Sequence, residues 1–426
     1  MKCYGFSLGC KVNAYETSSL LGALKEKGYA VVNTPEEADV ILLNTCAVTG
    51  TASQKSRQHM RRFRRLAPNA ILVAMGCYTK EVGEDALNLG ADIVAGTEMR
   101  KEILEAIEEF QKDHQKKYLI PQGRPKGAYE ELLSFSATPL TRAYLKIQDG
   151  CDKFCSYCAI PSLRGKSRSR TPENIFYEIK SLLSKGVKEI ILSGVEIGYY
   201  GKDFTDRKYD LANLLKDIFE TFPELPRLRI SSLDESEITD SFLDSFRKYP
   251  SFMPHFHLSL QSGSSSVLKR MRRRYDTESY FKSLEKLRSI QPDVAITTDI
   301  IVGFPLETEE EWKETLAFAK KCRFAEIHVF PFSKRKGTYA ATLEDVPAEI
   351  KKRRVRELLS LSKEMRREYE TRFFNQKLPV LFEEYDEKKK IAIGHTPNYL
   401  LVAKQSEVSL NGEIEEVLYT KENTLD

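Results

Sequence analysis

The sequence predicts an α/β protein with two modules of alternating strands and helices, followed by a small all-β domain. Apolar runs of buried-strand length alternate with helical segments within residues 1–112, and they do so again from Arg142 onward. Residues 376–426 instead hold short strand-like runs separated by turn residues. Because alternating strands and helices form right-handed crossovers, each of the first two modules should contain a parallel sheet.

Composition limits the functions that remain open. A chain of 426 residues with 41% hydrophobic content can bury a large core and should divide into two or three domains. Its net charge of +4 is small, so nucleic-acid binding would depend on local basic patches. No apolar run is long enough for a membrane span and Met1 begins no signal peptide, so we expect a cytoplasmic protein without a membrane partner. Disulfides are not expected among its eight cysteines.

Residues 1–112 should form the first domain, an open parallel sheet of the flavodoxin-like type. Three predicted strands each end on a cysteine, and they are residues 3–10, 40–46 and 71–77. The carboxyl ends of parallel strands meet at one edge, where ligands of such sheets gather. Cys10, Cys46 and Cys77 could therefore converge and hold a metal centre; the alternative is that they are small buried core residues.

A linker, residues 113–137, should separate this domain from the next. It is polar and contains Pro121, Gly123, Pro125 and Gly127. Residues 138–370 then alternate strands and helices again, with strands predicted at 143–148, 187–193, 227–233, 256–261, 294–302 and 325–330. Six such units indicate a partial (β/α)6 barrel, in which functional groups lie at the carboxyl ends of the strands.

A tight cysteine motif follows the first predicted barrel strand. Cys151, Cys155 and Cys158 can hold three irons of a cubane cluster and leave the fourth iron open to a ligand. Structural zinc sites normally close with four protein ligands, and His255 and His257 lie far along the chain. The motif therefore predicts a [4Fe-4S] cluster, with zinc binding or chance spacing as the alternatives.

These residues resemble the radical S-adenosylmethionine enzymes. Residues 192–196 (LSGVE) end the second barrel strand, where the superfamily holds the methionine amine of the cofactor, although Val195 departs from the more general Gly-Gly-Glu form. Residues 301–305 (IVGFP) end the fifth strand, where the superfamily usually contacts adenine. The resemblance implies cofactor binding at Gly194, Glu196 and Gly303. Alone, each segment would be an ordinary strand-to-loop glycine turn.

The whole organisation resembles the methylthiotransferases. Residues 376–426 are similar to a TRAM domain, a small RNA-binding β-barrel, through the segment 394–399 (GHTPNY) and Val402. Strands are predicted at 378–382, 390–394, 400–403 and 413–419, with a hairpin turn at Asn411-Gly412. This domain has six Lys and ten Asp plus Glu, a balance of −4, so RNA contacts there would be local. A barrel used only for packing is the alternative.

Residues 8–17 (LGCKVNAYET) resemble the subgroup that modifies threonylcarbamoyladenosine in tRNA, and residues 330–333 and 337–338 fit it too. The resemblance implies an enzyme that inserts a methylthio group at C2 of that base, beside the anticodon. It also implies S-adenosylmethionine, two [4Fe-4S] clusters, an electron donor of the flavodoxin or ferredoxin type, and a monomer. One cluster, on Cys151, Cys155 and Cys158, would begin the radical chemistry, and the other, on Cys10, Cys46 and Cys77, would present sulfur.

Three alternatives stay open. The substrate could be isopentenyladenosine in tRNA or an aspartate of a ribosomal protein, as in other methylthiotransferases. The chain could also be a non-catalytic RNA-binding protein with structural metal. The implied reaction agrees with the predicted radical enzyme. The hydrogen at adenine C2 is not acidic, so general acid-base groups cannot remove it at neutral pH and a radical is required.

Three basic runs are candidates for RNA contact, because an anticodon-loop base can be splayed out of its stack. The first run spans residues 55–65 and presents Arg57, Arg61 and Arg64 on one helix face. The second spans 269–274 and includes Arg270 and Arg273. Solvated helix surface is the alternative for both, and it is our interpretation of the third run, residues 351–356.

Overall fold

The computed structural model describes residues 1–132 and 141–425. The last residues of the predicted linker and the first of the predicted barrel module lie outside these ranges. Within the described residues, no helix is both long and apolar enough to cross a membrane.

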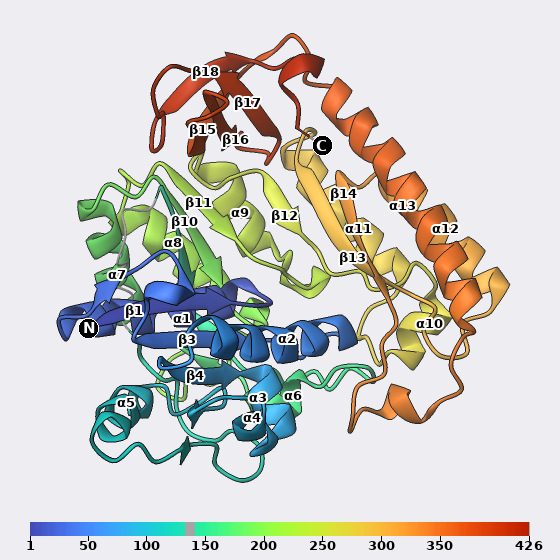
Figure 1. Cartoon of the computed structure of the whole chain (residues 1–426). Coiled ribbons are helices and arrows are strands. Elements are labelled where there is room, and N and C mark those ends of the chain that lie inside the picture. The colour runs from blue at the N-terminus through green and yellow to red at the C-terminus, as the bar shows by residue number, and fades with distance from the viewer. Residues whose placement is uncertain (133–140, 426) are drawn as a thin grey trace.

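The first module is a parallel sheet of six strands in the order β2-β1-β3-β4-β5-β6 (Figure 1). Its three long strands confirm the predicted ones: β1 (Lys2–Ser7), β3 (Val40–Thr45) and β4 (Ile71–Gly76). Three short strands, β2 (Ala30–Val31), β5 (Ile93–Val94) and β6 (Lys117–Tyr118), complete it. Because β6 pairs with β5, the sheet reaches into the predicted linker and ends later than expected.

Helices cover both faces of this sheet. They are α1 (Lys11–Glu26), α2 (Gly50–Leu66), α3 (Cys77–Val82), α4 (Asp85–Asn88) and α5 (Lys101–Asp113), with the 3-10 turn η1 (Pro35–Glu37). Alternate residues of β3 enter two separate cores, Ile41 and Leu43 on one face and Val40 and Leu42 on the other. This two-sided burial is typical of parallel sheets and explains why the strands read as unbroken apolar runs.

The second module contains the six predicted strands in two parallel sheets. One has the order β11-β10-β7 and the other β12-β13-β14. The strands are β7 (Arg142–Lys146), β10 (Glu189–Ser193), β11 (Arg227–Ile230), β12 (His255–His257), β13 (Ala295–Val302) and β14 (Glu326–Pro331). A parallel bridge between Leu233 and Leu258 joins the two sheets. The six strands therefore form one arc, which confirms the partial barrel.

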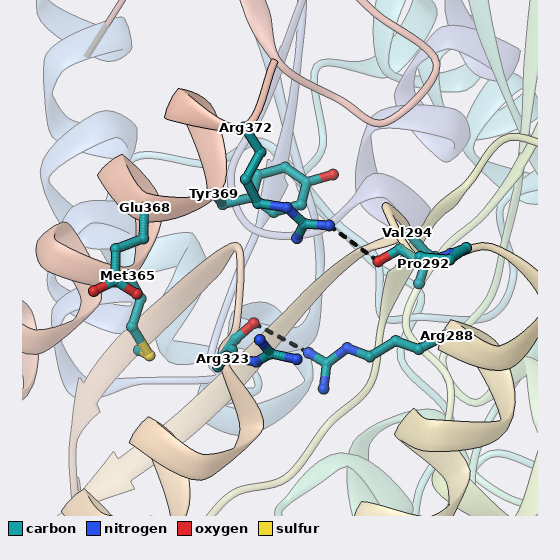
Figure 2. Close-up of a pocket in the computed structure, with 8 residues that line it drawn as sticks. All are labelled: Arg288, Pro292, Val294, Arg323, Met365, Glu368, Tyr369 and Arg372. Atoms are coloured by element: carbon teal, nitrogen blue, oxygen red, sulfur yellow. Dashed lines mark hydrogen bonds between the residues drawn. The ribbon is translucent and has the colours of Figure 1, made fainter. Parts of the chain in front are cut away.

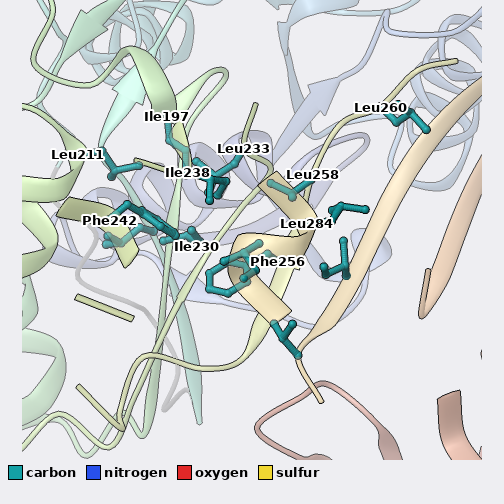
Figure 3. Close-up of a cluster of buried hydrophobic side chains, with 14 of the residues drawn as sticks. Ile197, Leu211, Ile230, Leu233, Ile238, Phe242, Phe256, Leu258, Leu260 and Leu284 are labelled. Carbon is teal, nitrogen blue, oxygen red and sulfur yellow. The ribbon is translucent and has the colours of Figure 1, made fainter. Parts of the chain in front are cut away.

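The outer face of this arc packs against the surrounding helices, and together they form the largest hydrophobic core among the described residues. The helices packed around it are α7 (Pro172–Ser184), α8 (Leu211–Thr221), α9 (Asp240–Lys248), α10 (Ser265–Arg270), α11 (Thr277–Ile290), α12 (Glu309–Cys322) and α13 (Ala348–Thr371). Ile230, Phe256 and Leu258 belong to this core (Figure 3). Because side chains alternate along a strand, His255 and His257 on either side of Phe256 face the interior of the arc. The interior is thus lined by polar groups on this wall, unlike the packed apolar layers of a closed barrel.

Short elements connect the barrel strands. The strands β8 (Gln148–Asp149) and β9 (Arg168–Ser169) pair with each other, and α6 (Ile160–Arg164) lies between them in the chain. The remaining 3-10 turns are η2 (Ile197–Tyr199), η3 (Glu235–Glu237), η4 (Tyr339–Thr342) and η5 (Lys421–Asn423). The Cys151–Cys158 loop is therefore held between β8 and α6.

The carboxyl-terminal domain is an antiparallel sheet in the order β17-β16-β15-β18, consistent with a TRAM domain. Its strands are β15 (Lys377–Asp386), β16 (Ile391–His395), β17 (Leu401–Gln405) and β18 (Ile414–Leu418). The predicted hairpin at Asn411-Gly412 is wrong, because β18 pairs with β15 instead of β17. The two residues still form a turn, with Gly412 at a φ of +87°, so the turn signal is local and does not specify the strand partner.

This domain packs against the beginnings of the barrel strands. Arg229 on β11 donates to the backbone carbonyls of Pro397 and Thr396. The Tyr399 ring stacks on His255, with ring centroids 4.5 Å apart. The domain covers the amino-terminal end of the barrel, while α13 runs along the side to reach it (Figure 1). The opposite end, where the strands finish, is the end that bears the cysteine loop.

Candidate active site with two cysteine triplets

The amino-terminal triplet consists of Cys10, Cys46 and Cys77. Each cysteine lies just beyond the end of β1, β3 or β4, three strands that are neighbours in one sheet. Contacts connect the three thiols: Gly9, just before Cys10, packs on the Cys46 sulfur. The Arg164 guanidinium contacts both the Cys77 sulfur and the Asn13 oxygen that lies 3.8 Å from the Cys10 sulfur. Burial raises the pKa of the Cys77 thiol to about 12, so it keeps its proton until a metal replaces it.

Two glycines allow the loops of this triplet to approach one another. A Cβ added at Gly9 would lie 2.7 Å from the Cys46 sulfur, and one added at Gly76 would lie 2.6 Å from the backbone oxygen of Thr45. Both glycines have a positive φ, which other residues rarely adopt. A glycine before two of the three cysteines is therefore required by the packing of the site.

Asn13 holds the same loops from the first turn of α1. Its amide nitrogen donates to the carbonyls of Leu8, at 2.8 Å, and Thr45, at 3.1 Å. Its carbonyl oxygen lies 3.8 Å from the Cys10 sulfur, which donates to it. One buried amide thus connects the Cys10 loop with the residue that precedes Cys46.

The barrel triplet consists of Cys151, Cys155 and Cys158. The Cys158 amide donates to the Cys155 carbonyl at 3.0 Å, and the Cys151 amide donates to the Gly165 carbonyl at 3.1 Å. Burial raises the pKa of the Cys151 thiol to about 11 and that of Cys158 to about 12. An arginine from a distant loop, Arg273, donates to the Cys155 sulfur at 3.4 Å.

The spacing of the thiols argues against a single zinc ion on either triplet. Three thiolates on one zinc would lie roughly 3.8 Å apart, given the Zn–S bond length of about 2.3 Å. Among the described residues, neither triplet has all three sulfurs within 4.8 Å of one another. A four-iron cubane places each thiolate on a different iron, so its ligands stand farther apart. All six cysteines are free thiols, as such ligands must be.

The first predicted cofactor segment lies beside the barrel triplet. The Gln148 side chain accepts from the Glu196 amide at 2.8 Å and donates to the carbonyl of Gly150 at 2.8 Å, so it connects this segment with the cysteine loop. Gly194 packs directly on it, because an added Cβ would lie 2.9 Å from its oxygen. The Glu196 carboxylate pairs with Lys153 at 2.8 Å. Its other oxygen is buried and has no partner within the described part of the chain, so it can accept from a ligand.

The second predicted segment is the turn after β13. Gly303 has a φ of +68°, and its amide donates to the Glu307 carboxylate at 2.9 Å. Glu307 is buried and pairs with Arg354 of α13 at 2.7 Å. Burial outweighs that positive partner and raises the pKa of Glu307 to about 7. The turn after β13 is therefore held to α13 through the Glu307 side chain.

The sequence did not predict a cluster of three polar side chains inside the barrel. His257, Asp299 and His328 come from β12, β13 and β14, and their ligand-type atoms lie within 4.8 Å of one another. The His257 ring lies 3.3 Å from the Asp299 carboxylate and 3.0 Å from the Thr297 hydroxyl. The available signal was alternation: His257 lies between Phe256 and Leu258, and His328 lies between Ile327 and Val329. Asp299 follows Thr298 and gives this signal less clearly.

The structure divides the basic candidates into exposed and internal ones. Arg57 and Arg61 are exposed on α2, whereas Arg64 bonds to the Gly90 and Ala70 carbonyls and pairs with Asp92. In the second run, Lys269, Arg272 and Arg274 are exposed, whereas Arg270 and Arg273 are half-buried, and contact of the run with RNA stays a prediction. Arg270 pairs with Glu311 at 2.6 Å, and the Arg273 side chain is only 6% exposed. Runs of arginine in the sequence do not reveal which members reach inward to carboxylates or thiols.

A separate cleft lies away from both triplets. Its volume is about 240 Å³, and it lies between α11, α13 and the start of β13 (Figure 2). Arg288 donates to the carbonyls of Cys322 and Arg323, and Arg372 pairs with Asp293, so two of its three arginines are engaged in structural contacts. No residue with candidate chemistry lines this cleft, and we assign it no role.

Comparison with known proteins identifies the family. The model of the Radical SAM superfamily matches residues 145–319, and that of "Uncharacterized protein family UPF0004" matches residues 2–96. Threonylcarbamoyladenosine tRNA methylthiotransferase MtaB of Bacillus subtilis is 40% identical, over 97% of this chain and 93% of that protein. This chain belongs to the radical S-adenosylmethionine methylthiotransferase family. Membership implies an enzyme that uses S-adenosylmethionine and a [4Fe-4S] cluster.

Other relatives belong to the same methylthiotransferase family. MtaB of Thermotoga maritima is 38% identical over 89% of this chain and 86% of that protein. The tRNA-2-methylthio-N(6)-dimethylallyladenosine synthase of Bacillus pumilus is 34% identical over 99% of this chain and 84% of that protein. Among solved structures, the radical S-adenosylmethionine methyltransferase TsrM from Kitasatospora setae has a TM-score of 0.59 at 14% identity, covering 80% of this chain and 77% of that one. That likeness shows the fold alone.

Proposed function

We propose that the protein inserts a methylthio group at C2 of N6-threonylcarbamoyladenosine, beside the anticodon of tRNA. The observation that carries this proposal is the pair of cysteine triplets, each at the carboxyl ends of a parallel sheet. The substrate is supported by the relatives named MtaB, which are 40% and 38% identical. Residues 8–17, around Cys10, support the same subgroup.

The chemistry requires a radical, because adenine C2 carries an unactivated hydrogen. A [4Fe-4S] cluster with bound S-adenosylmethionine supplies that radical. Cys151, Cys155 and Cys158 would hold the cluster. The free oxygen of Glu196, placed by Gln148, would accept from the amine of the cofactor. Gly303 would bring backbone close to its adenine.

We assign a second [4Fe-4S] cluster to Cys10, Cys46 and Cys77. Three protein ligands would leave one of its irons free to present sulfur, as the first would leave one free for the cofactor. The convergence of the three thiols supports this assignment. Electrons would come from a donor of the flavodoxin or ferredoxin type.

The polar interior of the barrel is our candidate for contact with the target base. His257, Asp299 and His328 supply donors and acceptors there, and they are half-buried or exposed instead of packed away. Lys11, in the segment that marks the subgroup, has no ion-pair partner among the described residues. Lys11 is exposed at the start of α1, and partial loss of hydration together with the positive charges of Arg142 and Arg229 lowers its pKa. We propose that it pairs with the carboxylate of the threonyl group.

We further propose that the chain acts as a cytoplasmic monomer, in the compartment that holds tRNA. The division into residues 1–112, 113–137, 138–370 and 376–426 remains our proposal for its domains. Pairing of β6 with β5 supports extending the first domain to Tyr118. Arg57 and Arg61 are the exposed cations that we assign to the tRNA backbone.

A second candidate is modification of isopentenyl-type adenosines. The relatives named for dimethylallyladenosine are 34% identical over nearly the whole chain. Overall sequence similarity therefore does not distinguish between the two substrates. An unpaired Lys11 favours the first candidate, because a dimethylallyl group offers no carboxylate.

Nucleoside mass spectrometry of tRNA from a deletion strain tests the function. We expect the methylthio group to disappear from threonylcarbamoyladenosine and to return when the wild-type chain or a Cys322→Ala variant is expressed. Cys322 is a buried core residue outside both triplets and therefore a matched control. Persistence of the modification without a redundant enzyme would falsify the proposal. Loss from isopentenyladenosine instead would assign the second candidate.

A further inference from the structure

A buried ionic network lies where the amino-terminal module meets the barrel. It contains four cations, Arg100, Lys146, Arg164 and Arg168, and three carboxylates, Glu16, Glu130 and Asp149. The count leaves one positive charge in excess. Glu16, on α1, is 1% exposed and is contacted by three of the cations. These ion pairs are therefore shielded from solvent.

Arg164 is the member of this network that reaches a sulfur. Its Nε donates to the Cys77 Sγ at 3.4 Å, and one Nη donates to the Asn13 oxygen at 2.7 Å. The other Nη donates to Glu16 and to Asp149, each at 3.0 Å. The side chain is 1% exposed, so the guanidinium has no freedom to turn toward solvent. Every nitrogen is used, and two of them serve the amino-terminal triplet.

The position of Arg164 in the chain connects the two triplets. It ends α6, the short helix that directly follows the loop of Cys151, Cys155 and Cys158. The next residue, Gly165, accepts the amide of Cys151 at 3.1 Å. A displacement of one cysteine loop would therefore be transmitted to Cys77 through a single rigid side chain.

We propose that Arg164 is a positioning residue that couples the two clusters: it fixes Cys77 relative to the barrel triplet and sets the reduction potential of the cluster on the amino-terminal triplet. The inference rests on the second cluster of the proposed function. Reduction adds negative charge to a cluster, and a nearby guanidinium that donates to a ligand sulfur stabilises the reduced form. Arg164 also donates to the Asn13 oxygen, and the Asn13 amide nitrogen donates to the carbonyls of Leu8 and Thr45, so the same guanidinium holds the residue that joins the Cys10 and Cys46 loops.

Arg100 offers a matched control within the same network. Its guanidinium is 2% exposed and pairs with Glu16 and Glu130, each at 2.6 Å. It makes no contact with a cysteine among the described residues. Loss of either arginine should weaken the network, but only loss of Arg164 should change the surroundings of a ligand sulfur.

The test measures the cluster of the amino-terminal triplet alone. In a Cys151→Ala, Cys155→Ala, Cys158→Ala background, the protein is reconstituted anaerobically with iron and sulfide. Redox titration followed by electron paramagnetic resonance is then compared for Arg164→Gln, Arg164→Lys and Arg100→Gln. We expect Arg164→Gln to shift the potential to more negative values, Arg164→Lys to give an intermediate value, and Arg100→Gln to leave it near that of the parent.

Other outcomes overturn the inference in distinguishable ways. An unchanged potential in Arg164→Gln would show that Arg164 contributes only to folding. An equal shift in Arg100→Gln would show that the potential responds to the net charge of the network and not to the hydrogen bond that Arg164 donates to Cys77. If Arg164→Gln does not fold, Arg164→Lys decides, since a potential equal to the parent's would remove the role of the donated hydrogen bond. Absence of any cluster signal in the background itself would instead overturn the second cluster of the proposed function.

Discussion

Each cysteine triplet has one arginine on one of its sulfurs. Arg164 donates to Cys77 and Arg273 donates to Cys155, both at 3.4 Å. Each guanidinium is also anchored by carboxylates, Arg164 by Glu16 and Asp149, and Arg273 by Asp234. A guanidinium fork held in this way presents its donors in a fixed direction and keeps its charge at any working pH. Both triplets are therefore built for ligand atoms that carry negative charge.

The first prediction separates the roles of the two triplets. Replacing Cys151, Cys155 and Cys158 by Ala should abolish cleavage of S-adenosylmethionine, because these thiols are the ligands that we assign to the cluster that binds the cofactor. Replacing Cys10, Cys46 and Cys77 should spare cleavage and abolish sulfur insertion. Chromatography of 5′-deoxyadenosine and of the modified nucleoside measures both reactions in the same sample.

Cys322→Ala is the control for this prediction, since it removes a buried thiol from α12 and touches neither triplet. If both triple variants lost cleavage equally while remaining folded, the assignment of two roles would be wrong.

At the residue scale, the sequence predicted which residues of one loop lie close together, but it did not predict contacts between residues that are distant in the chain. Cys151, Cys155 and Cys158 form a motif within one loop, so the sequence predicts their proximity directly. Arg273 appeared to belong to a surface patch because its neighbours are basic. Its contact with Cys155 spans 118 positions and depends on the fold of the whole barrel. No local pattern carries that information.

At the scale of elements, strand ends bring the site together. The amino-terminal cysteines converge because β1, β3 and β4 are adjacent and parallel. Apolar runs predicted these strands well, since burial on both faces makes them continuous. The two-residue strands β5 and β6 were not predicted, because they are too short to show a period. The pairing of β18 with β15 was not predicted either, because a turn dipeptide does not specify which strand follows.

The second prediction concerns the contact between the β13 turn and α13. The pKa of Glu307 rises from its ordinary 4.5 to about 7 through burial. A carboxyl with a raised pKa stabilises the folded state fully below pH 4.5, and this contribution is lost as the pH rises through about 7. The loss is on the order of 3 kcal/mol. Glu307→Gln is neutral throughout and should lack this dependence.

Thermal unfolding of the wild type and of Glu307→Gln at pH 5 and pH 7.5 measures the effect. We expect the wild type to lose more stability than the variant between the two values. Parallel behaviour would show that the Arg354 charge balances the burial of Glu307 and that its pKa is not raised.

At the scale of the whole molecule, the site has three walls from different modules. The amino-terminal sheet contributes one triplet, the barrel contributes the other, and the carboxyl-terminal domain covers the far end of the barrel. Sequence reasoning reached this division because each module has its own periodicity. It did not reach the contacts between modules, such as Tyr399 on His255 or Arg164 on Cys77, because those residues are distant in sequence.

The third prediction tests how tRNA is held. Arg57 and Arg61 are exposed on α2, and the Arg57 guanidinium lies 3.5 Å from the hydroxyl of Tyr78, the residue that follows Cys77. Arg57 therefore borders the amino-terminal triplet, and Arg61 lies one turn further along α2. Reversing both charges, with Arg57→Glu and Arg61→Glu, should weaken tRNA binding and lower the slope of log affinity against log salt by about 2.

Lys352→Glu with Arg356→Glu is the matched control for that variant. It reverses the same number of exposed charges on a different helix, α13, where Lys352 and Arg356 are exposed although Arg354 of the same run is buried. Filter binding or fluorescence anisotropy with tRNA at several salt concentrations gives both affinity and slope. An equal loss in both variants would indicate a general electrostatic field, and unchanged binding in the α2 variant would remove this patch from the interface. A loss confined to the α2 variant would place the anticodon arm across the mouth of the barrel, next to the triplet that presents sulfur.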